Sequence, residues 1–106
     1  MSPLSYAARE GHLHIVRRLL ERGADPNMPE DAAPDGRALY EACCRNHLEI
    51  AELLLKHGAN PNAGMDSCEC CLRIGAVYHG DSAKPLQRLL RRHGAITPSY
   101  ARGRKG

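Results

Sequence analysis

Cysteine and histidine side chains are the groups in this 106-residue chain that could bind a metal ion. A Cys-x-x-Cys spacing joins Cys68 to Cys71, and Cys70 lies between them. Further potential ligands occur elsewhere in the chain, at Cys43, Cys44, His47 and His79. Structural zinc requires four ligands that converge tetrahedrally, so the spacing alone does not establish a site.

The cysteines also indicate a redox environment. Their number is odd, and Cys43-Cys44 and Cys70-Cys71 are adjacent pairs, which argues against a disulfide framework. The sequence begins without a basic segment followed by an apolar one, so we expect no secretory signal. We therefore expect reduced thiols in a cytosolic or nuclear protein. The role of the cluster Cys68, Cys70 and Cys71 stays open between small buried side chains and exposed thiols prone to oxidation.

The sequence shows no constellation typical of a catalytic or cofactor site. It lacks a phosphate-binding Gly-x-x-x-x-Gly-Lys loop and the glycine pattern of a dinucleotide site. No nucleophile stands beside a general base in a recognisable arrangement. We predict a protein that is not an enzyme and that needs no cofactor or metal.

The chain repeats itself with a period of 35 residues. Gly23-Ala24-Asp25-Pro26-Asn27 returns as Gly58-Ala59-Asn60-Pro61-Asn62. The motif Gly11-His12-Leu13 returns as Asn46-His47-Leu48, and Leu19-Leu20 as Leu54-Leu55. A repeat of this length predicts a stack of identical supersecondary units rather than a globule with a cleft.

A third, more diverged copy follows the first two. It contains Leu72, Leu89-Leu90 and the closing His93-Gly94-Ala95. About three residues are added relative to the other copies, and we place them near Gly80-Asp81-Ser82. We predict repeat one over 1–30, repeat two over 31–65, repeat three over 66–97 and a tail over 98–106, all in one domain.

The repeat register argues against a shared zinc site. Cys71 aligns with Ala38, so Cys43 lies five positions further along its helix. Neighbouring helices are about 8–10 Å apart, and five residues add about 7 Å along the axis. The two groups of cysteines are therefore expected too far apart for one metal, and Cys43 is expected as a buried core residue.

Each copy is predicted to form two helices joined by a turn. Ser2 and Pro3 suit the start of the first helix, and Gly11 suits its end. Leu13, Val16 and Leu20 then form one apolar stripe, flanked by Ile15 and Leu19. In the second copy, the corresponding stripe contains Leu48, Ala51 and Leu55. In the third copy, Ser82 is the predicted cap of the last helix. The segments 28–36 and 63–67 are predicted to project as loops.

The first and second copies resemble the ankyrin repeat. The resemblance rests on Gly11-His12-Leu13, Leu19-Leu20 and Gly23-Ala24-Asp25, and on their equivalents in the second copy. It implies an all-α solenoid of three stacked helix–turn–helix units with intervening β-turn fingers. It also implies a scaffold that binds proteins, mostly through its concave face. The family's opening Thr-Pro-Leu-His is preserved only partly, as Ser2-Pro3-Leu4-Ser5, and the first copy lacks its finger. Members of the family normally have a polar capping repeat at each end, so we expect the N-terminal end here to leave Leu13 and Ile15 partly uncovered.

The resemblance also indicates which positions face a partner. They lie on the first helix of each unit and near its end, where Arg and Tyr can provide binding energy. The candidate partner-binding residues are Tyr6, Arg9, Glu10, Arg37, Tyr40, Cys44, Arg45, Val77 and Tyr78. The alternative is that these are ordinary solvated surface residues.

Charge is distributed unevenly along the chain. Residues 1–79 contain eight Lys or Arg against eleven Asp or Glu, whereas residues 80–106 contain seven against Asp81 alone. The basic residues of the last helix and the tail are Lys84, Arg88, Arg91, Arg92, Arg102, Arg104 and Lys105. They allow polyanion or nucleic-acid binding as an alternative function, or a soluble end cap of the stack.

The sequence therefore predicts a monomeric, non-enzymatic adaptor that binds a protein of unknown identity through its concave face, away from membranes. Nucleic-acid binding through residues 80–106 is the first alternative. The second is that the chain completes a longer array of the same units.

Overall fold

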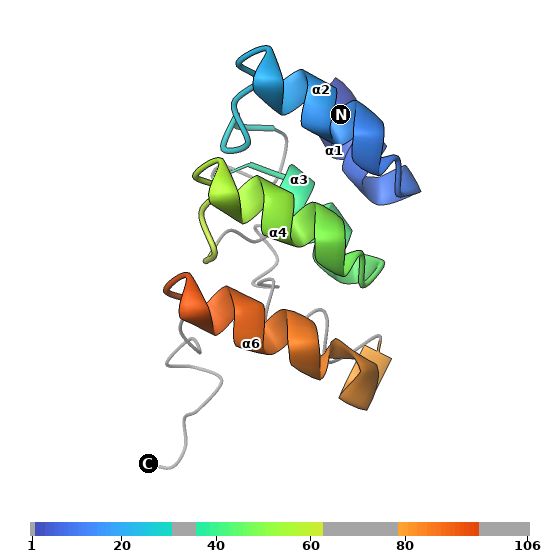
Figure 1. Cartoon of the computed structure of the whole chain (residues 1–106), viewed down its shortest axis with the longest axis vertical. Coiled ribbons are helices and arrows are strands. Elements are labelled where there is room, and N and C mark those ends of the chain that lie inside the picture. The colour runs from blue at the N-terminus through green and yellow to red at the C-terminus, as the bar shows by residue number, and fades with distance from the viewer. Residues whose placement is uncertain (1, 31–35, 63–78, 96–106) are drawn as a thin grey trace.

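The computed structural model describes residues 2–30, 36–62 and 79–95, and every regular element in them is helical. Figure 1 shows these helices as a stack along the long axis of the molecule. In chain order they are α1 (Pro3–Glu10), α2 (Leu13–Glu21), α3 (Ala38–Cys44), α4 (Leu48–Lys56), the 3-10 helix η1 (Gly80–Ala83) and α6 (Lys84–Arg92). The all-α prediction is confirmed. None of the helices in these ranges is long and apolar enough to cross a membrane.

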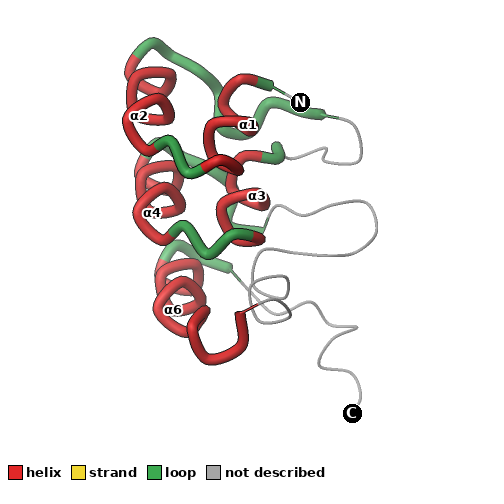
Figure 2. Tube along the Cα trace, turned by 90° about the vertical axis from the view of Figure 1, so that its right-hand side faces the viewer, coloured by secondary structure: helices red, strands yellow, loops and turns green. Residues whose placement is uncertain are grey.

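The helices form two layers, which are separated in the view of Figure 2. We call α1 and α3 the inner layer, and α2, α4 and α6 the outer layer. Within the layers, α1 contacts α3, α2 contacts α4, and α4 contacts α6. The pairs α1–α2 and α3–α4 also pack against each other, so each is one helix–turn–helix unit of the predicted kind.

Local sequence explains where the first helix begins and ends. The Ser2 hydroxyl accepts a hydrogen bond from the backbone N–H of Ser5 at 3.1 Å, and Pro3 follows in the first turn. Both features match the predicted helix start. Gly11 ends the helix in the left-handed region at φ 80°, which a residue with a Cβ adopts only at a cost.

The last helix begins differently from the prediction. Ser82 does not cap α6, because it lies inside the 3-10 turn Gly80–Ala83, which runs directly into the helix. The backbone N–H of Lys84 is bonded to the carbonyl of Asp81 in that turn. This turn lies where the sequence places the added residues, near Gly80-Asp81-Ser82, and Pro85 lies in the first turn of α6.

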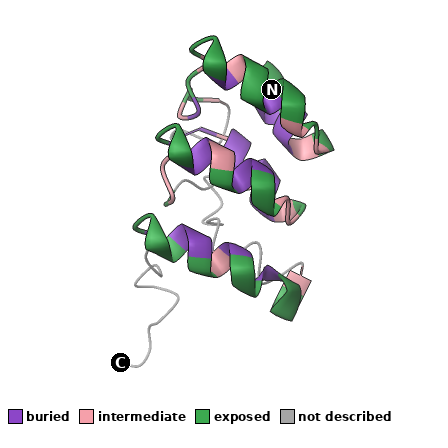
Figure 3. Ribbon diagram, in the orientation of Figure 1, coloured by how far each residue is buried: buried purple, intermediate pink, exposed green. Residues whose placement is uncertain are grey.

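The core lies between the two layers, where the buried faces of the helices meet (Figure 3). Its large aliphatic members are Leu4, Val16, Leu20, Leu39, Ile50, Leu54, Leu55, Leu86, Leu89 and Leu90. Cys43 is fully buried among them, as predicted for a small hydrophobic side chain.

The position of a helix in the stack decides how far its apolar residues are buried. Ile15 of α2 is 47% exposed, whereas Ile50 at the same register of α4 is 3% exposed. The difference arises because α4 is covered by α2 on one side and α6 on the other. The prediction that Ile15 is left uncovered is confirmed. Leu48, which was predicted within the buried stripe, is instead 39% exposed at the start of α4.

Asparagine side chains connect the turns of successive units. Asn27 Nδ2 donates to the carbonyl of Gly58 at 2.9 Å, and Asn27 Oδ1 accepts from the backbone N–H of Asn60 at 2.7 Å. Asn62 Nδ2 makes a longer contact of 3.4 Å to the carbonyl of Gly94. The repeated Asn therefore stabilises the contact between one unit and the next, beyond forming its own turn.

Candidate functional site

One face of α3 carries a shallow depression of about 500 Å³. It is lined by Arg37, Tyr40, Glu41, Cys44, Arg45 and His79. Five of these residues follow the spacing i, i+3, i+4, i+7 and i+8, which places them on one side of a helix. His79 enters from the following unit and closes one end. Among the described residues, this concave site of the inner layer is therefore built mainly by α3 and the residues at its two ends.

Four of the nine residues predicted to bind a partner line this depression, namely Arg37, Tyr40, Cys44 and Arg45. Arg37 is the residue before α3 and Arg45 the residue after it, so they lie at opposite ends of the depression. Tyr40 and Cys44 lie between them and are partly buried. The structure thus brings these four side chains together.

The three predicted residues of the first unit lie outside that depression, on α1. Tyr6 is 51% exposed, and the guanidinium carbon of Arg9 lies 5.2 Å from the centre of its ring. At this distance a cation–π attraction holds the two side chains together. Arg9 Nε also forms an ion pair with Glu10 Oε2 at 3.0 Å. Because α1 packs against α3, these residues extend the same layer.

The remaining predicted residues, Val77 and Tyr78, lie outside the described residues. The same is true of the cysteine cluster Cys68, Cys70 and Cys71, and of the tail. Their predicted roles are not tested. Among the residues that the structure describes, no three His, Cys, Asp or Glu side chains lie close enough to hold a metal ion.

An ion pair forms part of the wall of the depression. Arg37 Nε donates to Glu41 Oε2 at 2.7 Å, although the Glu41 side chain is only 8% exposed. The hydrogen bond to Glu41 raises the pKa of Arg37, since it stabilises the charged guanidinium. The pair neutralises the carboxylate and fixes the start of α3.

Glu41 and His79 are site residues that sequence reasoning missed. Glu41 follows from the helical spacing of Arg37 and Arg45, since it lies four residues from each. His79 Nε2 lies 2.7 Å from the carbonyl of Cys44, and a carbonyl only accepts, so the ring donates this hydrogen bond. The signal for His79 was its relation to His47, whose Nε2 contacts the carbonyl of Arg9 in the same way.

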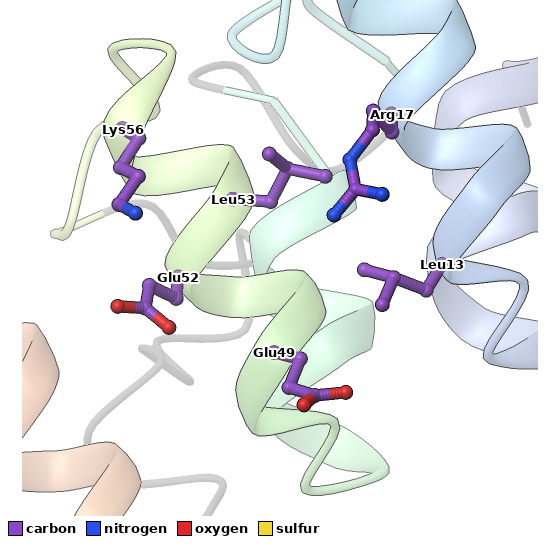
Figure 4. A pocket seen from close by; sticks show the side chains of 6 residues that line it. All are labelled: Leu13, Arg17, Glu49, Glu52, Leu53 and Lys56. Atoms are coloured by element: carbon purple, nitrogen blue, oxygen red, sulfur yellow. The ribbon is translucent and has the colours of Figure 1, made fainter.

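The outer layer carries smaller depressions. One of about 180 Å³ lies between α2 and α4, and Figure 4 shows Leu13 and Arg17 of α2 facing Leu53 across it. The acidic side chains Glu49 and Glu52 flank it on α4. It contains none of the predicted partner-binding residues and less than half the volume of the depression on α3.

Comparison with known proteins identifies the family to which this architecture belongs. A family model described as "Ankyrin repeats (3 copies)" matches residues 1–65, more than half of the chain. The chain belongs to the ankyrin-repeat family. The crystal structure of the human ASB11 ankyrin repeat domain is similar, with a TM-score of 0.79 over 91% of this chain and 26% sequence identity. This likeness extends the ankyrin architecture beyond the matched residues into the third unit.

A curated relative shows the same family over a shorter stretch. The human ankyrin repeat and SOCS box protein 18 is 58% identical over 43 residues, which are 40% of this chain. The ankyrin chain described here spans 8% of that protein and 41% of the ASB11 domain structure. Ankyrin repeats are generally protein–protein interaction modules, and the family is typically non-enzymatic.

Proposed function

We propose that this ankyrin array is a non-enzymatic adaptor that holds a protein partner on the concave side of its inner layer. The observation that carries the proposal is the clustering of Arg37, Tyr40, Cys44 and Arg45 in one depression on α3. Arg and Tyr are enriched among residues that dominate binding energy, because each combines a large contact area with a polar group. Tyr6 and Arg9 on α1 enlarge the surface to a second unit.

Two arginines in this position already have partners within the array. Arg37 is held by Glu41, and Arg9 is held by the Tyr6 ring and Glu10. Side chains ordered before binding lose less conformational entropy when the complex forms. Arg37 and Arg9 are therefore better prepared to bind than unrestrained side chains.

Affinity capture followed by quantitative binding tests this proposal. The array is used to isolate a partner from cytosolic and nuclear lysates, and the partner is then purified and titrated against wild type, Tyr40→Ala and Leu48→Ala. Leu48 is a matched control, because it is an exposed apolar residue on the opposite layer. We expect Tyr40→Ala to weaken binding about 30-fold, which corresponds to about 2 kcal/mol.

Circular dichroism must show that both variants are folded. A partner that binds wild type and Tyr40→Ala equally, but is lost with Leu48→Ala, would place the interface on the outer layer and refute the proposal.

A second candidate function is polyanion binding through α6. Arg88, Arg91 and Arg92 are exposed on this helix, and none forms an ion pair among the described residues. Lys84 is paired with Asp81 at 3.5 Å. Titration with a labelled oligonucleotide at increasing salt tests this function, since contact with three phosphates gives a slope of about −2 in a plot of log K against log salt for a single strand. Absence of binding at low salt would exclude it.

A further inference from the structure

Within the part of the chain that the structure describes, the arginines of the depression on α3 offer more accessible hydrogen-bond donors than its lining residues offer acceptors. Its two prominent acceptors are already engaged or poorly accessible: Glu41 Oε2 accepts from Arg37 Nε and the Glu41 side chain is only 8% exposed, and the carbonyl of Cys44 accepts from His79 Nε2. A partner therefore meets few unsatisfied acceptors here. Groups that only donate, such as the ammonium of a lysine, gain little in this position.

The donors at the two ends of the depression remain available. Arg45 is exposed, and its side chain makes no ion pair or hydrogen bond among the described residues. Arg37 uses only Nε for Glu41, so its two terminal amino groups make no hydrogen bond within those residues. A guanidinium has five N–H donors in a planar fork that matches the two oxygens of a carboxylate.

The charged residues that line the depression are two arginines and one glutamate, so positive charge is in excess there. Arg37 is attracted to Glu41 and also to Glu30, whereas Arg45 has no ion pair among the described residues. An occupant of opposite charge removes this imbalance, and charge-assisted hydrogen bonds to Arg are stronger than neutral ones. The Tyr40 ring between the two arginines offers apolar contact to the methylene groups of a side chain.

From this arrangement we propose that the depression binds an acidic segment of the partner protein, with Arg45 contacting an Asp or Glu carboxylate. The inference rests on the proposed function and specifies the chemistry of the partner. A phosphate backbone is the competing source of negative charge, but the exposed arginines of α6 belong to the outer layer and are separate from this site.

The experiment is fluorescence anisotropy with three labelled probes: a Glu-rich 12-residue peptide, the same peptide with Gln at each Glu, and a single-stranded 12-nucleotide DNA. The proteins are wild type, Arg45→Gln and Arg22→Gln. Arg22 is a matched control, because its substitution removes the same charge from an exposed position at the end of α2.

We expect the Glu-rich peptide to bind wild type and Arg22→Gln equally, and Arg45→Gln at least about 10-fold more weakly. The Gln peptide should bind none of them comparably. An Arg45→Glu variant should lose the Glu-rich peptide and gain affinity for a Lys-rich peptide of the same length.

Three outcomes overturn the inference: no saturable binding of the Glu-rich peptide up to about 1 mM, equal losses in Arg45→Gln and Arg22→Gln, or DNA bound more tightly than the peptide with the same dependence on Arg45. The proposed function can fail separately. A captured partner that needs Tyr40 but not Arg45 refutes only the acidic segment, whereas a partner indifferent to both residues refutes the inner-layer interface itself.

Discussion

The ring of His47 lies against Gly11 of the preceding unit, and its Nε2 is 3.3 Å from the carbonyl oxygen of Arg9. Because a carbonyl only accepts, Nε2 must carry the proton. His79 repeats the contact at 2.7 Å to the carbonyl of Cys44, one unit further along. Each histidine thus satisfies a carbonyl at the end of the previous inner helix and joins consecutive units.

This contact predicts that Gly11→Ala destabilises the array. A Cβ at position 11 would lie 3.0 Å from Cε1 and 3.2 Å from Nε2 of His47. The left-handed backbone costs a residue with a Cβ about 1–2 kcal/mol, and displacing His47 from Arg9 adds about 1 kcal/mol. Urea denaturation measures the sum as a loss of the free energy of unfolding.

Gly23→Ala provides the control for this prediction. Gly23 has a similar φ of 93°, but a Cβ there would meet nothing within 4 Å. The control variant should show the backbone cost alone. Equal losses in the two variants would mean that the contact with His47 contributes nothing measurable.

A core substitution tests the stacking of the outer layer. Leu54 is fully buried in α4, the helix that lies between α2 and α6. Leu54→Ala should cost about 2–5 kcal/mol, from lost burial and the cavity left behind. Leu48→Ala, at an exposed position of the same helix, should cost about half of that or less. Thermal melts that rank the two variants in the opposite order would contradict the assigned register.

Sequence periodicity predicted the helices well because the physics that decides them is local. Gly11, Gly23 and Gly58 mark helix ends, and the apolar spacing of α2 and α4 repeats at 35 residues. The burial of individual side chains was predicted less well than the helices, because burial depends on which helices lie on either side in the stack. Ile15 and Ile50 have the same local sequence pattern, yet only Ile50 lies beneath helices on both sides.

The candidate site was predictable only in part. Arg37, Tyr40, Cys44 and Arg45 follow from the resemblance to ankyrin repeats and from helical spacing. The pairing of Arg37 with Glu41 was not anticipated, because the choice of partner depends on side-chain orientation. His79 was missed as a site residue because it follows His47 by 32 residues, whereas His47 follows His12 by 35.

Acid should weaken the contact between the start of α1 and Glu30, which lies in the segment after α2. The Glu30 carboxylate accepts hydrogen bonds from Ser5 Oγ, the Ser2 backbone N–H and Ser2 Oγ. Partial burial raises the pKa of Glu30, but these hydrogen bonds outweigh it, and the net pKa is lowered from 4.5. The stabilisation is therefore complete above pH 4.5 and is lost as the pH falls through the lower pKa of the folded state.

Glu30→Gln tests this dependence. The variant should be less stable than wild type at pH 7, and the difference should shrink as the pH falls below 4.5. Glu21→Gln, at an exposed position at the end of α2, should follow the wild-type dependence. If the difference in the free energy of unfolding between wild type and Glu30→Gln stays constant from pH 7 to pH 3, the charge of Glu30 does not cause the loss of stability in the variant.

The hydrogen bonds that connect successive turns predict that substitutions of Asn27 lower the stability by different amounts. Its side chain donates to the carbonyl of Gly58 and accepts from the N–H of Asn60, so Asn27→Ala removes both hydrogen bonds. Each such bond contributes about 0.5–1.5 kcal/mol, which gives an expected loss of about 1–2 kcal/mol at this partly exposed site. Asn27→Asp can still accept from Asn60 but cannot donate to Gly58, so its loss in urea denaturation should be intermediate. If Asn27→Asp were as damaging as Asn27→Ala, the bond from the Asn60 N–H would not outweigh the repulsion between the Asp carboxylate and the carbonyl oxygen of Gly58.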